Sequence, residues 1–600
     1  MSHPLFYGTT GPQDARIMIV GEAWGRDELS AKKPFVGASG MELDRMLGEA
    51  GISRSDCLCS NVVAGQPLNN QMWRFFHPRD EKKPDYWGLH PHDSTRQEIS
   101  RLWQQIAACQ PTLIIAVGNY ALWALTESAR ITYKGSDERG AMEGGGRMVP
   151  TGVGDFRGSM LWTRPSHTML WAQPKEFKIP VLPIIHPAAI LREWSWRAIT
   201  IHDLKTRIPM AFAKQWEAPL YKINIRPTVE QAEEYFASRM ELANTRPVEC
   251  SIDLETMVFD NNWRGVTCIS FCTEMNNAIT IPFIDKTPAG DIVPYWPSPQ
   301  TEARAVRAMC NFMAHSNVGA FGQNFLYDES YIRDHWAVVP RVSFDTMLAH
   351  HLIWPGTPKA LGYLSSIYCE HHRFWKDDNR EWGNKASPDT HFLYNGEDAI
   401  RTFEIAGRQR ALISQLGLDA LWNDELEKQE LAFEMMSRGV KIDLKARGRL
   451  VHELMAAGEQ HQAALLTLMP QAWVDSLMGK AKPAKEGKFW FSSSKQVQFV
   501  FYDILGMPLQ KERKTGNATV GAKALEVLRD KMPQFALLFD LLENMRSIAN
   551  MSAVLRVRLS RDSRMRCSFN TGGTETFRWS SSESPLGEGT NLQNVTSGEE

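Results

Sequence analysis

Residues Ser251–Thr256 read Ser-Ile-Asp-Leu-Glu-Thr and decide the fold of the middle of the chain. Apolar residues alternate there with two acids, Asp253 and Glu255, so the stretch predicts a half-buried β-strand. Side chains two residues apart on a strand point to the same face, which places the two carboxylates together. Two negative charges this close repel each other unless a cation lies between them. The stretch therefore predicts an oxygen-ligand site for Mg²⁺ or Mn²⁺.

The composition of the whole chain limits what the protein can be. Its 600 residues are too many for one core and predict three or four domains. A formal net charge of −2 does not indicate a generally basic nucleic-acid binder, so contact with DNA would have to come from local basic patches. Nine cysteines without a Cys-x-x-Cys pair predict a reducing, cytoplasmic location. We expect neither a signal peptide nor a membrane partner, because apolar runs are short and interrupted.

The first segment, residues 1–215, predicts an α/β domain. Short apolar strands are expected at Arg16–Val20, Leu113–Val117 and Val181–Ile185, separated by stretches with helical character. Strands that alternate with helices favour a sheet covered by helices, with polar residues gathered at the strand ends.

Five blocks of this segment, in this order, resemble the uracil-DNA glycosylase superfamily and most closely its iron–sulfur family. The blocks are Gly21–Glu28, Lys33–Gly37, Ser60–Val63, Ala116–Ala121 and His186–Arg192. The resemblance implies a glycosylase-like α/β sandwich whose pocket receives a base flipped out of DNA.

The same resemblance assigns roles to five side chains of the implied pocket. Glu22 and Glu28 would be the acids that line it. Phe35 would stack on the flipped base, Asn61 would read its Watson–Crick edge, and His186 would stabilise the departing base anion. An aromatic face, a matching amide and a hydrogen-bond donor are what such chemistry needs.

Two departures from the family pattern bear on activity. Trp24 stands where the family usually has Pro, and the spacing of Cys57, Cys59 and Cys109 does not reproduce the four cysteines of the cluster. We therefore expect no iron–sulfur cluster. Two interpretations stay open for this segment: an active glycosylase, or a fold that only binds DNA or supports the rest of the chain.

The middle segment, residues 216–415, adds two further motifs to the paired acids. Asn324 and Asp328 are four residues apart, which predicts one shared face at a helix start, and the same spacing relates Tyr394 to Asp398. With the paired acids, these motifs resemble the DEDD-type 3′–5′ exonucleases that carry Tyr four residues before the last Asp. The resemblance implies a ribonuclease H-like domain.

A two-metal mechanism follows from the ligand set that the resemblance implies. Asp253, Glu255, Asp328 and Asp398 would hold two divalent ions, about 3.5–4 Å apart, which clamp the attacking and leaving oxygens at phosphorus. Tyr394 would orient the attacking water. The expected products are nucleoside 5′-monophosphates, removed from a single-stranded 3′ end.

The last segment, residues 416–600, carries two motifs near its end. Thr574–Ser581 and Asn591–Val595 resemble the Arg-containing and Asn-Leu-Gln-Asn motifs of family A DNA polymerases, the class of bacterial DNA polymerase I. The resemblance implies a mainly helical thumb with the start of a palm. It also implies that primer–template DNA is contacted by Arg578, Gln593 and Asn594, and Asn324 is likewise assigned to DNA binding.

The expected function is the N-terminal part of a replicative, phage-type family A polymerase with a proofreading exonuclease, placed in the cytoplasm or nucleoid of an infected bacterium. The sequence reaches Glu600 before the palm carboxylates of that family. We therefore expect the remaining palm and fingers on a longer chain or on a separate one. One alternative is a repair protein that combines uracil excision with trimming. In the other, the front domain is a non-catalytic docking module.

Overall fold

The structure is a computed structural model, and its described residues form two compact units. The first unit is built from positions up to 429 together with Thr574–Phe577, and the second from Glu430–Gly573, Trp263 and positions after 577. The described residues are 5–77, 86–134, 147–164, 178–216, 219–259, 263–378, 387–478, 489–513 and 516–595. The element order follows the α/β pattern expected from the sequence, with further domains beyond it.

The first sheet has the strand order β2-β1-β3-β7-β6. All neighbours are parallel except the edge strand β6, which runs antiparallel to β7. The bounds are β1 Ile17–Ala23, β2 Cys57–Val63, β3 Leu113–Val117, β6 Leu161–Trp162 and β7 Pro180–Ile184. The central strands read as continuous apolar runs because helices cover both of their faces.

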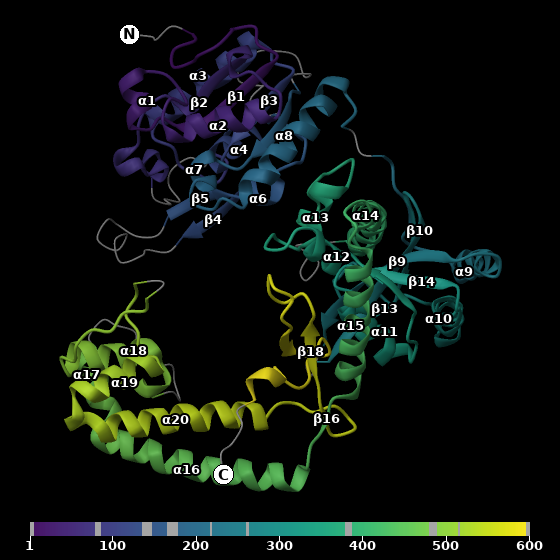
Figure 1. Cartoon of the computed structure of the whole chain (residues 1–600), viewed down its shortest axis with the longest axis vertical. Helices are drawn as coiled ribbons and strands as arrows, with labels where there is room; N and C mark the ends of the chain where they lie inside the picture. Colours follow the sequence, from purple (N-terminus) through teal and green to yellow (C-terminus); the bar gives the residue numbers. More distant parts are fainter. Residues whose placement is uncertain are drawn as a thin grey trace. The chain divides into compact units, whose positions relative to one another are not determined.

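Alternate residues of β1 identify the two faces of this sheet. Met18 and Val20 pack into one buried cluster with side chains of α3 (Asp93–Cys109) and α4 (Asn119–Leu125). Ile17 and Ile19 pack into another cluster with side chains of two further helices, α2 (Ala38–Glu49) and α8 (Trp196–Ala213). The result is a three-layer α/β/α sandwich, in the purple and blue part of Figure 1.

The second sheet is mixed and has the order β15-β14-β9-β10-β11-β8. Strands β9, β10 and β11 form an antiparallel meander, whereas β14 runs parallel to β9, β15 to β14, and β8 to β11. The bounds are β8 Lys222–Asn224, β9 Val248–Val258, β10 Arg264–Glu274, β11 Asn277–Pro282, β14 Val318–Gly322 and β15 Val342–Asp345.

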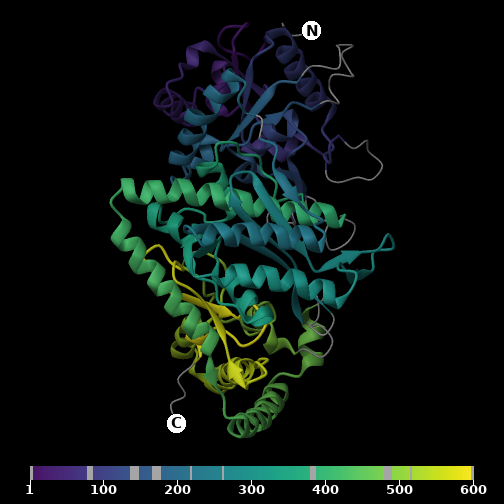
Figure 2. The same cartoon turned by 90° about the vertical axis from the view of Figure 1, so that its right-hand side faces the viewer.

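Helices cover both faces of the second sheet. Phe271 of β10 packs edge-to-face on Phe236 of α9 (Val229–Ala243) on one face, beside α10 (Pro299–Met313). Its neighbour Cys272 faces the other way, toward α14 (Pro388–Gln415). In Figure 2, α14 is the long green helix that crosses the sheet. The Oγ of Ser251 donates to the carbonyl of Ala399 in α14 at 2.6 Å, so odd-numbered residues of β9 face this helix.

Buried arginines join the two sheet domains within the first unit. Arg157 makes a two-pronged ion pair with Asp203 of α8, at 2.7 and 2.6 Å, and donates to the Oγ of Ser366 at 2.7 Å. Arg207 donates to the Ser366 carbonyl at 2.9 Å, near the end of α13 (Leu361–Tyr368). All of these side chains are buried. Since buried polar groups need hydrogen-bond partners, the two domains depend on each other for these contacts.

The second unit is mainly helical. Its long helices α16 (Leu444–Leu468) and α20 (Ala536–Leu555) pack together, and the shorter helices close an apolar core at one end. The shorter helices are α17 Gln471–Met478, α18 Ser494–Gln498 and α19 Ala522–Lys531. Two small two-stranded antiparallel sheets, β16–β17 and β18–β19, complete it, with the bounds Val440–Lys441, Arg564–Met565, Cys567–Asn570 and Ser580–Glu583.

Among the helices formed by the described residues, none combines the length and the apolar character needed to cross a bilayer. The predicted domain boundaries at 215/216 and 415/416 stay predictions. The second of these falls between the end of α14 and the start of α15 (Asp419–Arg438).

Candidate metal and base-recognition sites

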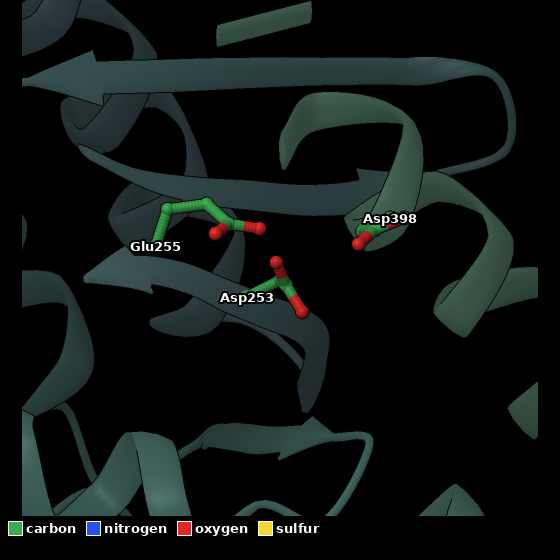
Figure 3. A group of neighbouring side chains, drawn as sticks. All are labelled: Asp253, Glu255 and Asp398. Carbon is green, nitrogen blue, oxygen red and sulfur yellow. The ribbon is translucent and has the colours of Figure 1, made fainter. Parts of the chain in front are cut away.

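Three carboxylates meet between the second sheet and α14. Asp253 and Glu255 extend from β9 and Asp398 from α14, and one oxygen from each lies within 4.8 Å of the others (Figure 3). The strand alternation explains the first two, because Ile252 and Leu254, which alternate with them, are buried on the opposite side. The third comes from a distant part of the sequence, and the helix brings it across the face of the strand.

The surroundings of these acids disfavour their charged forms. Burial, the carboxylate of Asp398 and then that of Asp328 raise the pKa of Asp253 well above its usual range. Burial and Asp398 raise the pKa of Glu255 to about 8. Desolvation and like charges both penalise ionisation. A divalent cation would remove this penalty, since its oxygen ligands are most stable when ionised.

Asp328 lies next to this group but does not join it. It belongs to α11 (Leu326–Trp336) and is buried, and its Oδ1 accepts a hydrogen bond from the backbone N–H of Leu254 at 3.0 Å. Burial raises its pKa well above the usual range. Its oxygens are not within the 4.8 Å group formed by the other three acids. Its role as a metal ligand stays a prediction.

Tyr394 and Asp398 share α14 as the four-residue spacing predicts, and a lysine joins them. The ammonium of Lys376 donates to the Tyr394 hydroxyl at 2.9 Å and to Asp398 Oδ2 at 2.5 Å. The indole N–H of Trp375 donates to Asp398 Oδ1 at 2.6 Å. Burial, and next the charge of Asp398, raise the pKa of Tyr394 far above its usual value, so its phenol keeps its proton.

Asn395 is a further residue of this site that sequence reasoning missed. Its amide donates to Asp253 Oδ2 at 2.7 Å and to the Asp253 carbonyl at 3.2 Å. Its own oxygen accepts from Ser270 Oγ at 2.5 Å, and the side chain is fully buried. Asn395 therefore fixes the orientation of the Asp253 carboxylate. The sequence offered one indication of this role, since Asn395 directly follows the predicted catalytic residue Tyr394.

Asn324 does not share a helical face with Asp328, so that expectation is wrong. Helix α11 begins only at Leu326, and Asn324 precedes it in the left-handed region, with φ +59°. Asparagine tolerates this conformation better than most residues. Its backbone N–H donates to Asp345 Oδ1 at 3.2 Å, and its side chain is exposed.

The two acids of the predicted base pocket are held by backbone groups of the first domain. Glu22 Oε1 accepts from the N–H of Tyr120 at 3.1 Å, at the start of α4. Glu28 Oε1 accepts from the N–H of Phe35 at 2.6 Å, and its other oxygen accepts from Gly25. Each carboxylate therefore orders a loop.

The other predicted pocket residues lie around the end of β1. Phe35 and Asn61 are buried, and both approach Gly21 so closely that a Cβ there would lie 2.8 Å from the Phe35 ring and 2.5 Å from Asn61 Nδ2. Within the part of the chain that the structure describes, Asn61 Oδ1 has no hydrogen-bond partner. His186 Nδ1 accepts from the N–H of Ala188 at 3.1 Å, so a neutral ring carries its proton on Nε2, where it can donate.

A cavity of about 470 Å³ opens beside this region. Phe35 lines it together with Lys33, Asp44 and Arg54, but the other four predicted pocket residues do not. Arg54 donates to Asp44 at 2.8 Å and to the Phe35 carbonyl at 2.8 Å, which holds the loop around Phe35 in place. The positive φ of Phe35, +56°, is stabilised by these contacts.

The three residues expected to contact primer–template DNA lie in the second unit and are exposed. Gln593 and Asn594 belong to a short 3₁₀ helix, Leu592–Asn594. The Gln593 amide donates to the Trp579 carbonyl at 3.2 Å, which ties this helix to the segment that carries Arg578. The structure thus brings the two end motifs together, and their role in DNA binding stays a prediction.

Comparison with known proteins identifies the first domain. Residues 8–208 match the model of the uracil DNA glycosylase superfamily. The type-4 uracil-DNA glycosylase of Saccharolobus solfataricus is 27% identical over 197 residues, covering 32% of this chain and 71% of that protein. Those of Archaeoglobus fulgidus and Thermotoga maritima are 33% identical over 115 residues and 32% over 122 residues, covering 18% and 20% of this chain. The chain spans about half the length of these last two relatives, 47% and 55%.

Among solved structures, the POL domain of Pol1 from M. smegmatis, in complex with DNA primer-template and dNTP, aligns with a TM-score of 0.42 and 21% identity. The alignment covers 61% of this chain and 55% of that one. A TM-score of this size does not establish a shared fold, so the polymerase interpretation rests on the sequence motifs. The superfamily match, in contrast, coincides with the three-layer sandwich. Residues 8–208 form a domain of the uracil DNA glycosylase superfamily.

Proposed function

We propose that the carboxylate site is a metal-dependent 3′–5′ exonuclease centre. The observation that carries the proposal is the convergence of Asp253, Glu255 and Asp398, from a strand and a helix, within 4.8 Å. Three carboxylates at this spacing suit Mg²⁺ or Mn²⁺, and burial together with the nearby charge of Asp398 raises the pKa of Asp253 and of Glu255 unless a cation lies between them. The proposed occupancy is two ions, with Asp328 as the fourth ligand.

Different residues of the chain have different roles in the proposed reaction. Bound metal would supply Lewis-acid stabilisation of phosphate oxygens and an activated water. Asn395 fixes the orientation of the Asp253 carboxylate, which would hold a cation. Tyr394, whose pKa is raised by burial and by Asp398, remains protonated and can donate its O–H to the attacking water. The product is a nucleoside 5′-monophosphate from a single-stranded 3′ end.

The wider proposal is that the chain is part of a replicative family A polymerase. The exposed residues Arg578, Gln593 and Asn594, joined by the contact between Gln593 and the Trp579 carbonyl, support a surface for primer–template DNA. An exonuclease on the same chain would then remove mispaired primer ends. The remaining palm and fingers would come from the same or from a separate chain.

The decisive experiment for the exonuclease uses Asp253→Ala with a single-stranded oligonucleotide labelled at its 5′ end. With Mg²⁺, the unchanged protein should produce a ladder from the 3′ end, and the variant should not. Asp285→Ala is a suitable control, because Asp285 is a partly buried acid that pairs with Arg226 and does not belong to the carboxylate group. Undiminished laddering by Asp253→Ala would refute the proposal.

A second candidate function, uracil excision, is favoured by a separate observation. The superfamily match covers residues 8–208, and the buried side-chain oxygen of Asn61 has no partner among the residues that the structure describes, which leaves it available to read a base edge. Release of uracil from a uracil-containing strand, lost in Asn61→Ala, would establish this activity. If no uracil is released and Asn61→Ala weakens DNA binding instead, the domain is a binding module.

A further inference from the structure

The segment Phe374–Asp377 contacts both domains of the first unit. Its two inner residues, Trp375 and Lys376, hydrogen-bond to Asp398 in the carboxylate site. Its two outer residues hydrogen-bond to the glycosylase superfamily domain, through Ser159 and Arg130. We call this segment the strap. It spans four residues, so a displacement of its ends must move its centre.

The glycosylase superfamily domain holds the strap by stacking and by charge. Arg130 makes a two-pronged ion pair with Asp377, with Nε and Nη2 at 2.7 and 2.8 Å from the carboxylate oxygens. Its guanidinium carbon lies 5.4 Å from the ring centroid of Phe156 and 5.2 Å from that of Phe374. The two rings also pack edge-to-face, with centroids 5.0 Å apart. The N–H of Phe374 donates to Ser159 Oγ at 3.1 Å.

On the nuclease side, the strap engages both oxygens of Asp398. Trp375 is fully buried, and the guanidinium of Arg401 lies over its ring at 4.1 Å. Lys376 donates to the other oxygen of Asp398 and to the hydroxyl oxygen of Tyr394. Because that hydroxyl oxygen accepts from Lys376, its own O–H must point elsewhere. Lys376 therefore sets the direction in which Tyr394 can donate.

We propose that the glycosylase superfamily domain is a working part of the nuclease site: through the strap it holds Lys376, a positioning residue, against Tyr394 and Asp398. Lys376 orients the Tyr394 hydroxyl for the attacking water. Its ammonium also neutralises part of the negative charge at Asp398 and would compete there with a cation. This inference rests on the proposed exonuclease function and gives the front domain a role that requires no base excision.

The first test weakens the strap from the front domain. In the full chain, Arg130→Gln and Asp377→Asn should each lower kcat on single-stranded DNA by about tenfold, because a small displacement of a positioned group is costly. The double variant should be no slower than either single one, since both break the same contact. Arg197→Gln is the matched control. The Arg197 side chain is 18% exposed, close to the 20% of Arg130, and it pairs with Glu49 within the front domain. It should behave as the unchanged protein.

The second test separates positioning from general support. Lys376→Met should lower kcat by about tenfold, as expected for loss of a group that orients a catalytic residue, while Mn²⁺ binds more tightly to the DNA-free protein. In a protein that already carries Tyr394→Phe, Lys376→Met should lower kcat much less, because Lys376 acts through the Tyr394 hydroxyl. Lys376→Arg should keep part of the rate. A merely structural role would weaken Mn²⁺ binding and slow the reaction together.

The outcomes distinguish this inference from the proposed function. If Asp253→Ala degrades DNA normally, the exonuclease assignment fails. If Asp253→Ala is inactive but Arg130→Gln and Lys376→Met match the unchanged protein in kcat and Mn²⁺ affinity, the strap inference alone fails. Thermal unfolding of each variant shows whether it is folded. Should Arg130→Gln not fold, Asp377→Asn carries the test, because it breaks the same contact from a carboxylate that is partly exposed, at 28%.

Discussion

The carboxylate site and the predicted base pocket differ in how their acids are satisfied. In the pocket, Glu22 and Glu28 accept hydrogen bonds from backbone N–H groups. In the carboxylate site, Asp253 and Glu255 face Asp398, and their pKa values rise because burial and like charge disfavour ionisation. Acids bound to the backbone order a loop, whereas acids that face one another repel unless they are protonated or a cation lies between them. The first site is therefore expected to work without metal and the second to depend on it.

Chelation is the largest expected effect and tests this comparison directly. EDTA should abolish shortening of a single strand, because the three carboxylates cannot stabilise phosphate charge by themselves. Added Mg²⁺ should restore it. Uracil release, assayed in parallel on a uracil-containing strand, should persist, since acids bound to backbone N–H groups need no cation. Strand shortening that continues in EDTA would show that the carboxylate site is not a metal centre.

Replacing Asn395 should give the next largest effect. Asn395→Leu removes the amide that holds Asp253 Oδ2 at 2.7 Å, and loss of such a supporting contact typically lowers metal affinity by about 10- to 100-fold. Titration with Mn²⁺ in a calorimeter measures it. Asn317→Leu is the control, because the amide of Asn317, which directly precedes β14, donates to the Ala243 carbonyl at the end of α9. Equal Mn²⁺ affinity in both variants would show that Asn395 does not support the metal ligand Asp253.

Replacing each of two glycines of α14 by alanine should give smaller effects on stability, of opposite sign. A Cβ on Gly396 would lie 2.4 Å from Cγ2 of Ile223, whereas among the described residues nothing lies within 4 Å of one on Gly407. Gly396→Ala should cost about 1–3 kcal/mol of stability and weaken Mn²⁺ binding, because the overlap displaces α14. Gly407→Ala should stabilise the helix by up to about 1 kcal/mol. Chemical denaturation distinguishes them, and equal midpoints would contradict the close packing of α14 on β8.

The last expected effect is a pH dependence of the metal-free protein. The folded state raises the pKa of Glu255 from 4.5 to about 8, so between these values it binds more protons than the unfolded chain. Stability should therefore fall as pH rises through this window. Glu255→Gln lacks this carboxyl and should lose less stability on going from about pH 5 to about pH 8. Thermal unfolding in EDTA measures this difference, which saturating Mg²⁺ should abolish or reverse. Identical pH profiles would contradict it.

The features predicted correctly are those set by local periodicity. Alternation placed Asp253 and Glu255 on one face of β9, and the four-residue spacing placed Tyr394 and Asp398 on α14. Apolar runs located β3 at its observed bounds and β7 within one residue. These patterns depend on burial of a single strand or helix face, which a short stretch of sequence records.

What could not be predicted depends on contacts between distant segments. Trp375 and Lys376 lie outside any helix or strand, so no periodicity marks them, and their importance arises from Asp398. Asn324 was misplaced because a left-handed residue precedes α11, and a four-residue spacing cannot distinguish such a turn from a helix. Arg130 reaches Asp377 only through the packing of two domains.

The buried arginines between the two sheet domains have a consequence for dividing the protein into pieces. A shortened chain that starts at residue 219 would lack Arg157 and Arg207, and so would leave Ser366 and the carbonyl groups near the end of α13 without their donors. It would also expose the Phe374 face that Phe156 covers. Expression of the second sheet domain by itself should therefore yield a poorly soluble product, and the smallest tractable fragment begins with the glycosylase superfamily domain.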